Sequence, residues 1–535
     1  MNTEIETIIA AGTADDKVWG PTLKAFIEKA SGSYNFPELL QGSKRKDFWK
    51  ALLHIAKHSQ DPCVIRDCFV VMRLLSREKQ CLAELINEEW RDLIKKHSGL
   101  CDPNFEFSEQ KTPICIEVQK SLSNIMFNSR GLAEDFRTNG ILTGLQRRIR
   151  DYENEKIPDE VRFFDMKLFF LITALSSDAR SDMKSMFDLL VNLLVEELRE
   201  AADNHFEHED LPPLYLMDTQ VDLVNEILKA LFNITVGTDE SDAEVLVSCY
   251  SLVEVLRSYL LICSNNLEKT WALRNNVINL LTNMPDETYK ALLLPVHEGH
   301  RVPNNLVFED YNMTAIYEIL MFLKAKFNDQ LKINNQHEIL SPVVTVLLKG
   351  ASGHRVIRKF LRNHILPPLT DVHTRPEEGS TLRNHLCRLL TTPIMELRDL
   401  DAELLFVLCK KSVSRMIKYT GYGNAAGLFA QRGLLGGGHI KGEDDFSSES
   451  ENSETEEYAD HKHGINPVIG CYEEPHPSAM ENMSEEQLMD SLMKCGTIKP
   501  CTVGADGKPK PIDHILQLRE ALPAQQVRNV DEDSD

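Results

Sequence analysis

The sequence has few basic residues for its length and no long apolar run. Its 535 residues include 59 Lys and Arg against 82 Asp and Glu, a formal net charge of −23. Binding to nucleic acid needs clustered Lys and Arg to neutralise phosphates, so this charge makes nucleic acid a poor partner. Nothing approaches 18 consecutive apolar residues, which excludes a transmembrane helix. The N-terminus lacks the basic and apolar regions of a signal peptide, so we expect a protein that is not secreted.

None of the 12 cysteines belongs to a Cys-x-x-Cys pair. The chain is also too long to need disulfide bonds for stability. Cys115 and Cys409 lie on apolar faces, where a free cysteine behaves as a small hydrophobic residue. We therefore expect a reduced, cytosolic protein.

Patterns typical of β-hairpins are scarce, and apolar residues recur at helical spacing almost throughout. In the segment Thr219–Thr235, apolar residues follow one another at three or four positions, which indicates a half-buried helix. The same spacing predicts helices over 63–75, 114–127, 163–175, 185–198, 243–261, 271–281, 314–322, 339–348, 382–390 and 400–409. The sequence therefore predicts an all-α protein.

The predicted helices share a recurring ending, in which an apolar run closes on a small or polar residue. Examples are VMRLLSRE (71–78), SLSNIMFNS (121–129), LITALSSD (171–178), KALFNITVG (229–237), INLLTNMPD (278–286), VTVLLKGAS (344–352) and LLFVLCKKS (404–412). Their spacing slightly exceeds the roughly 40–47 residues of armadillo and HEAT repeats, which inserts at 204–218 and 295–311 explain. No repeat could bury its apolar face alone, so we expect a curved α-solenoid. The alternative is a set of unrelated helical bundles.

The composition changes near Gly421. Residues 421–438 contain seven of the chain's 26 glycines, and residues 443–460 contain nine acidic residues without Lys or Arg. Such an acidic run cannot bury enough apolar area to stay folded. Weaker helical patterns return at 484–495 and 512–522. We predict a repeat solenoid over 1–420, a Gly-rich turn or helix end over 421–440, an acidic disordered linker over 441–482, and a short helix with a disordered tail over 483–535.

Three local patterns resemble catalytic or metal sites. Residues 421–426 match the Gly-x-Gly-x-x-Ala form of the dinucleotide motif, but that motif needs a preceding strand, and a basic, helical segment precedes it here. We interpret it as a turn between helices. A metal could bind His205, Glu207, His208 and Asp210, or the pair His461 and His463. Both groups lie in polar segments without a second rigid ligand set, so solvated loops are the simpler interpretation.

Sequence motifs for covalent catalysis are missing. The chain has no Gly-x-Ser-x-Gly, P-loop or His-Glu-x-x-His motif. We therefore expect neither an enzyme with covalent chemistry nor a cofactor.

Two segments near the end of the predicted solenoid closely resemble the synembryn family. They are RKFLRNHILPPLTDVHTRPEEGSTLRNHLCRLL (358–390) and AELLFVLCKKSVSRMIKYTGYGNAAGLFAQRGLL (402–435), of which YTGYGNAAGL is the most specific part. VMRLLSRE, SLSNIMFNS, VRFFDMKLFFLITAL (161–175), EILKALFNIT and INPVIG (465–470) also resemble family segments, in family order. The family consists of cytosolic exchange factors and folding chaperones of heterotrimeric G protein α subunits (Gα).

The resemblance implies an armadillo/HEAT-like superhelix followed by a flexible acidic segment and a C-terminal helix. Its concave face would take the C-terminal helix of a GDP-bound or nascent Gα, not of the βγ-bound heterotrimer. GDP would then leave, and GTP would release the complex. The resemblance further implies a monomer in the cytoplasm that can be recruited to the cell cortex or plasma membrane.

The resemblance also points to groove residues. Arg73 and Arg77 lie four residues apart on one predicted helical face, and guanidinium groups suit capture of the Gα C-terminal carboxylate. Asn124 and Asn233 resemble armadillo asparagines that bind the main chain of a peptide. Phe164 would form an apolar wall. The alternatives are a solvated arginine pair, asparagines that cap helix ends, and a core phenylalanine.

The acidic run contains two candidate phosphorylation sites. Ser448 precedes Glu451 by three residues, and Ser453 precedes Glu456 by three, the spacing favoured by acidophilic Ser/Thr kinases. Family members carry two activating phosphosites in the equivalent segment. The alternative is a linker that only improves solubility.

Two features of the sequence depart from the family pattern. The segment after MSEEQ is soon interrupted by Gly496 and Pro500, where relatives carry a longer helix, and the first 60 residues match poorly. A peptide-binding adaptor and a folding chaperone without exchange activity are the competing interpretations.

Overall fold

The computed structural model describes residues 2–10, 15–40, 42–152, 156–207, 214–238, 242–296, 302–328, 336–369, 374–434, 501–503 and 509–511. The chain forms two compact units, Met1–Phe322 and Leu323–Asp535. Helices dominate both units, which confirms the predicted all-α class. None of the described helices is both long enough and apolar enough to cross a membrane.

The first unit contains α1 (Asn2–Ala10), α2 (Asp16–Ala30), η2 (Pro37–Leu40), α3 (Lys44–His58), α4 (Pro62–Leu75), α5 (Leu82–Leu85), α6 (Glu88–Ser98), α7 (Lys111–Asn128), α8 (Arg130–Thr138), α9 (Ile141–Arg150), α10 (Asp159–Leu175), α11 (Ser177–Met183), η3 (Lys184–Met186), α12 (Phe187–Glu207), α13 (Asp218–Thr235), α14 (Ala243–Tyr259), α15 (Leu267–Leu281), η4 (Asp286–Leu292) and η5 (Asn304–Leu306). Helix α16 (Thr314–Asn328) continues into the second unit, which contains α17 (Gln336–Gly353), α18 (Arg355–Ile365), α19 (Leu382–Leu389), α20 (Met395–Leu408), α21 (Val413–Thr420) and α22 (Tyr422–Gln431). The η elements are 3₁₀ helices.

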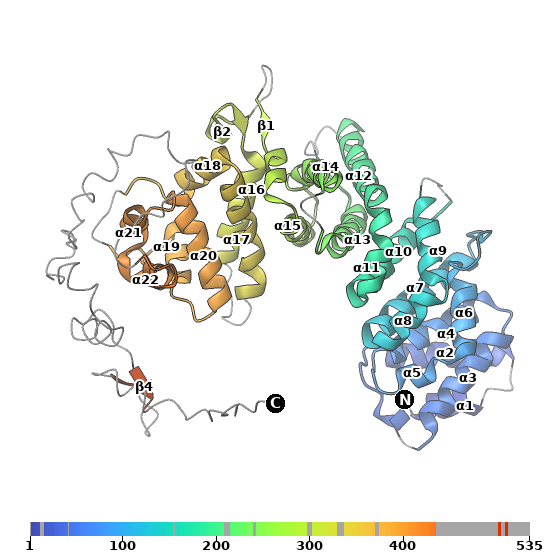
Figure 1. Ribbon diagram of the computed structural model, residues 1–535. Helices are drawn as coiled ribbons and strands as arrows, with labels where there is room; N and C mark the ends of the chain where they lie inside the picture. Colours follow the sequence, from blue (N-terminus) through green and yellow to red (C-terminus); the bar gives the residue numbers. More distant parts are fainter. Residues whose placement is uncertain are drawn as a thin grey trace, which may run out of the picture. The chain divides into compact units, whose positions relative to one another are not determined.

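Six helices of the first unit form a stack. Helices α2, α4, α7, α10, α13 and α15 each pack against the next in this order (Figure 1). Five of the recurring sequence segments form the ends of α4, α7, α10, α13 and α15, so they mark successive members of the stack. The remaining two lie in α17 and α20, which pack together in the second unit. The predicted helical repeats are therefore confirmed as a solenoid.

Helix α4 shows how the sequence forms one member of the stack. The Asp61 side chain accepts a hydrogen bond from Cys63 N at 2.8 Å, and Pro62 occupies the first helical position, where its missing N–H has no cost. The helix packs between α2 and α7, and its buried apolar residues are Val64, Cys68, Phe69, Val71, Met72, Leu74 and Leu75. Burial on two sides explains the nearly continuous apolar run.

The second predicted insert forms a small sheet. Strands β1 (Leu294–Pro295), β3 (Tyr311–Asn312) and β2 (Val307–Phe308) pair antiparallel in that order. In the first insert, α12 continues to Glu207 and a described segment resumes at Leu214.

The Gly-rich segment contains a turn and a further helix. Gly421 has a φ of 78° and separates α21 from α22, as the interpretation of a turn between helices predicted. Short strands β4 (Cys501–Val503) and β5 (Pro509–Pro511) pair antiparallel in the segment predicted to hold a short helix and a tail. The acidic linker and the helical patterns at 484–495 and 512–522 lie outside the described residues.

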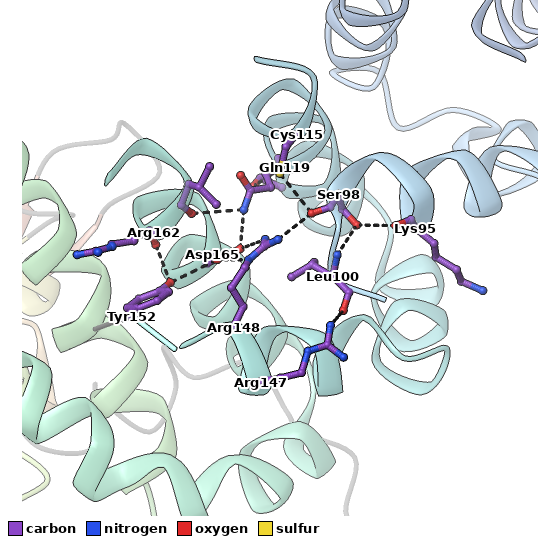
Figure 2. A network of polar contacts seen from close by, with 12 residues as sticks. Lys95, Ser98, Leu100, Cys115, Gln119, Arg147, Arg148, Tyr152, Arg162 and Asp165 are labelled. Atoms are coloured by element: carbon purple, nitrogen blue, oxygen red, sulfur yellow. Dashed lines mark hydrogen bonds and ion pairs between the residues drawn. The ribbon is translucent and has the colours of Figure 1, made fainter. Parts of the chain in front are cut away.

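A buried ion pair fixes the spacing of the middle of the stack. Arg148 on α9 donates through Nε to Asp165 Oδ2 on α10 at 2.7 Å, and Nη2 also contacts Oδ1. Gln119 Nε2 on α7 donates to Asp165 Oδ1 at 2.5 Å, and Arg148 Nη1 donates to the Ser98 carbonyl at 2.8 Å. Figure 2 shows Arg148 between Asp165 and Ser98. Segments of α6, α7, α9 and α10 therefore meet at this ion pair.

The surroundings of this pair decide its charge. Burial raises the pKa of Asp165 above its usual value, while the charge and hydrogen bonds of Arg148 oppose this rise. Burial also acts to lower the pKa of Arg148, but Asp165 outweighs it and the pKa is raised. Because Arg148 donates to both carboxylate oxygens of Asp165, we assign both side chains as ionised.

Asp165→Asn should destabilise the first unit, because it leaves the Arg148 charge buried without a counter-charge. Breaking a buried pair typically costs about 3–5 kcal/mol. The measurement is hydrogen exchange of α9 and α10 amides in the full chain, together with thermal unfolding. Arg199→Gln is the matched control, because it breaks the exposed pair with Glu196. Equal protection in Asp165→Asn and the control would contradict the assigned role.

Candidate functional site

One face of the stacked helices carries charged and aromatic side chains in register. We define the ladder face by Arg73 on α4, Glu117 and Lys120 on α7, Phe164 and Lys167 on α10, and Glu226 and Lys229 on α13. Residues three, four and seven apart lie on one side of a helix, so each helix presents its residues to this face. Predicted groove residues Arg73 and Phe164 belong to it.

The ladder face begins with linked ion pairs between α4, α7 and α10. Arg73 Nε donates to Glu117 Oε2 at 2.9 Å, and the two side chains are 27% and 12% exposed. Lys120 Nζ lies 3.2 Å from Glu117 Oε1 and 3.1 Å from Glu160 Oε1. Arg73 is therefore already paired, and a partner's carboxylate would have to compete with Glu117.

Lysine ammonium groups lie over phenylalanine rings further along the ladder face. Lys120 Nζ is 5.2 Å and Lys167 Nζ is 5.9 Å from the Phe164 ring centroid. Lys229 Nζ is 4.8 Å from the Phe170 centroid and 2.6 Å from Glu226 Oε1. Such cation–π contacts contribute about 0.5–1 kcal/mol at exposed sites. Phe164 is half-buried beneath lysines rather than in the core.

Arg77 does not share a helical face with Arg73, which corrects the geometry expected from their spacing. Helix α4 ends at Leu75, so Arg77 lies beyond it. Arg77 Nη1 donates to the Ser33 carbonyl at 2.7 Å and the Ser31 carbonyl at 3.1 Å, towards the end of α2. The two arginines therefore reach towards opposite neighbours of α4.

The asparagines tie successive helices of the stack together. Asn124 Nδ2 donates to the Arg73 carbonyl at 3.2 Å, and Asn233 Nδ2 donates to the Phe170 carbonyl at 3.1 Å. Asn233 Nδ2 also contacts Thr173 Oγ1 at 3.0 Å. These amides satisfy backbone carbonyls near the ends of neighbouring helices. This geometry resembles the alternative interpretation, in which the asparagines cap helix ends.

Sequence reasoning missed two features of this face. Asn283 Nδ2 donates to the Phe232 carbonyl at 2.9 Å and contacts Thr235 Oγ1 at 3.0 Å, which repeats the geometry of Asn233 one helix later. Lys120 and Lys229 were also not singled out. Both features could be recognised from the sequence. The segments EVQKSLSN (117–124) and EILKALFN (226–233) share Glu, Lys and Asn at the same spacing, and Asn283 occupies the position of their asparagine in the next recurring segment.

The phosphorylation and metal hypotheses fall mainly outside the described residues. Ser448 and Ser453 lie there, as do the side chains of His205, Glu207, His208, Asp210, His461 and His463. Over the described part of the chain, no three His, Cys, Asp or Glu side chains are grouped to hold a metal ion.

The stack and its ladder face define a helical-repeat protein with an extended polar and aromatic surface. A family model described as "Guanine nucleotide exchange factor synembryn" matches residues 68–508. The chain belongs to this family, which confirms the resemblance found in the sequence.

Relatives match over nearly their full length. The "Chaperone Ric-8" of Drosophila melanogaster is 36% identical, covering 90% of this chain and 91% of that protein. The "Chaperone Ric-8A" of Gallus gallus is 34% identical, covering 96% and 97%. A solved structure from work on a phosphorylation switch between cadherin and β-catenin aligns with a TM-score of 0.41 and 12% identity, covering 81% of this chain and 70% of that one. That likeness is too weak to assign a ligand.

Proposed function

We propose that this chain binds GDP-bound or nascent Gα subunits, not the βγ-bound heterotrimer, promotes exchange of GDP for GTP and assists Gα folding. Family membership over residues 68–508 carries the proposal. A protein that binds nucleotide-free Gα better than GDP-bound Gα must weaken GDP binding by the same coupling free energy. No bond needs to break, so the activity requires a binding surface rather than catalytic groups. The activity is cytoplasmic, with recruitment to the cell cortex or plasma membrane.

The ladder face is the proposed site for the Gα C-terminal helix. It alternates cations, carboxylates and aromatic rings over α4, α7, α10 and α13, which suits an amphipathic helix with charged and apolar side chains. In this proposal Phe164 contacts the apolar side of the ligand. Asn124 and Asn233 hold the helices that present the ladder face, because their Nδ2 atoms donate within the stack.

The purified full chain should accelerate GDP release from GDP-loaded Gα. Release is followed with a fluorescent or radiolabelled nucleotide, and Gα alone is the control. Formation of a stable complex without faster release would favour the peptide-binding adaptor. Improved yield of folded Gα without faster release would favour a chaperone without exchange activity.

The double change Arg73→Gln with Arg77→Gln should weaken Gα binding. Loss of a charge-assisted hydrogen bond costs roughly 1.5–3 kcal/mol, or about 10- to 100-fold in affinity. Glutamine is preferable to glutamate, because a glutamate at position 73 would face Glu117.

Two controls accompany this variant in titrations with labelled Gα. Arg199→Gln removes an exposed positive charge on α12 and should bind as wild type. Glu117→Gln removes the carboxylate that competes for Arg73 and should tighten binding. A folded double variant with normal affinity would refute the arginine assignment.

Phosphorylation at Ser448 and Ser453 is the proposed control of the second unit. Each phosphate adds about −1.5 to −2 charge and strong acceptor atoms. The second unit presents basic residues on α18, whose Val356, Ile357 and Phe360 are buried while Arg355 is exposed. We propose that the phosphorylated segment lies against Arg355, Arg358, Lys359 and Arg383.

Treatment with an acidophilic kinase should speed Gα activation by wild type but not by Ser448→Ala with Ser453→Ala. The phosphorylated segment should also resist proteolysis, because contact with α18 would shield it from the protease. Ser491→Ala is the control, because the residue three positions after Ser491 is Lys494 rather than an acid. Identical exchange rates and identical cleavage before and after treatment would contradict this role.

A further inference from the structure

The core of the second unit contains a carboxyl group that lacks a compensating partner. Asp401 lies in the middle of α20, and its side chain is fully buried. Neither of its carboxyl oxygens has a hydrogen-bond partner among the described residues. A charge buried without a counter-charge is so costly that the group takes up a proton instead. The charge of Asp401 therefore depends on whether the surrounding helices stay packed.

Asp401 lies where α20 meets α19. Helix α20 packs against α17, α18, α19, α21 and α22. Burial, and after it the nearby Asp401, raise the pKa of the Cys387 thiol on α19 to about 12. Cys387 Sγ lies 4.0 Å from the Tyr419 carbonyl oxygen on α21. Asp401 and the buried Cys387 thiol therefore share one contact region, which joins α20 to α19 and α21.

Cations on the helices around α20 are engaged with other groups. The pairs are His337 on α17 with Glu396, Arg358 on α18 with the Ala351 carbonyl, Arg388 on α19 with the Glu377 carbonyl, Arg398 on α20 with Asp399, and Arg432 after α22 with Glu403. These contacts direct the positive charges to carbonyl groups and to other carboxylates.

Three further arginines act on the buried thiols of this region. They oppose the effect of burial on the thiol pKa: Arg383 on α19 for Cys387, and Arg362 on α18 and Arg415 on α21 for Cys409. By contrast, burial alone raises the pKa of Asp401 well above its usual value. The electrostatics therefore agree with the geometry, in which the Asp401 carboxyl group has no partner.

We propose that Asp401 makes the packing of α19 and α21 against α20 sensitive to pH. In the packed form Asp401 carries a proton. When the helices separate, water reaches the carboxyl group and the proton is released. Acid therefore favours the packed form, and alkaline conditions favour the opened form, in which Cys387 is also accessible. This inference goes beyond the proposed function and does not depend on it.

The direction and size of the effect follow from the protons bound in each form. At neutral pH the opened form has lost the Asp401 proton, because the usual pKa of aspartate is 3.8. The contribution of Asp401 to packing is therefore complete below that value and is lost as the pH rises. While the packed form keeps its proton, the ratio of opened to packed form rises about tenfold per pH unit.

His385 on α19 acts in the opposite direction. Burial and the neighbouring Arg388 lower the pKa of His385, so opening lets this side chain take up a proton in acid. This contribution fades above the usual histidine pKa of 6.5. Measurements between about pH 7 and about pH 8 therefore isolate Asp401.

The test measures how fast N-ethylmaleimide labels individual cysteines of the full chain at these two pH values. The reagent attacks the thiolate of an accessible cysteine, and mass spectrometry of peptides separates the sites. Labelling of the exposed Cys63 corrects for the reactivity of the reagent. The ratio of Cys387 to Cys63 labelling should rise about tenfold between the two pH values. Cys115 on α7, whose thiol pKa burial also raises to about 12, should keep a constant ratio.

Two variants assign the effect to one carboxyl group. Asp401→Asn keeps the shape of the side chain but cannot titrate, so its Cys387 ratio should stay constant between the two pH values. Asp399→Asn is the matched control on the same helix, because its carboxylate is 43% exposed and pairs with Arg398 at 3.0 Å. This control should keep the tenfold rise.

The possible outcomes decide the inference without reference to Gα. A wild-type Cys387 ratio that stays constant would overturn it, as would a rise of equal size in Asp401→Asn. An equal rise at Cys115 would show that the whole chain opens and would also overturn it. If Asp401→Asn does not fold, hydrogen exchange of wild-type α19 amides, corrected for the intrinsic exchange rate, must show the same tenfold change for the inference to stand.

Discussion

Burial of each stacked helix on two opposite flanks is the constraint on which the rest of the first unit depends. Helices α4, α7, α10 and α13 each lie between two neighbours, so neither flank can carry charge unless it is paired. Apart from buried, hydrogen-bonded groups such as Gln119 and Asp165, the polar side chains lie on the remaining narrow stripe. That stripe is the ladder face. The alignment of its side chains from one helix to the next follows from the packing of the helices behind it rather than from contacts within the face.

Hydrogen bonds and ion pairs between helices fix the spacing of the helices more narrowly than apolar packing alone does. The Asn233 and Asn283 amides each join a backbone carbonyl and a threonine hydroxyl of the preceding helix. Arg148 and Asp165 do the same between α9 and α10, at a higher cost because both charges are buried. Hydrogen bonds are directional, so these ties define the distance and rotation of neighbouring helices more sharply than apolar contacts do. Gln119 on α7 donates to Asp165 on α10, so the distance between Lys120 and Phe164 also depends on groups behind the ladder face.

The helices were well predicted from the sequence, because a helix that is buried on one or two flanks carries apolar residues at a regular spacing. The sequence also identified the segments that form successive members of the stack. It did not predict that Arg77 turns away from Arg73, because that depends on α4 ending at Leu75. Nor could it pair Glu78 with Arg45 or Asp165 with Arg148, since each pair joins different helices. The sequence also showed no sign that Asp401 is fully buried in α20, where burial raises its pKa well above the usual value.

The pairing within the ladder face also limits what it can contribute to binding. Arg73 already has Glu117, and Lys120 has both Glu117 and Glu160. A partner that pairs with these cations exchanges one ion pair for another, so the competing carboxylates offset part of the gain in free energy. A partner with mismatched charges, by contrast, leaves groups unpaired and is rejected. The ion pairs of the ladder face therefore suit selectivity and orientation. The rings of Phe127 on α7 and Tyr34 after α2, which are 67% and 72% exposed, offer apolar area that can contribute to affinity.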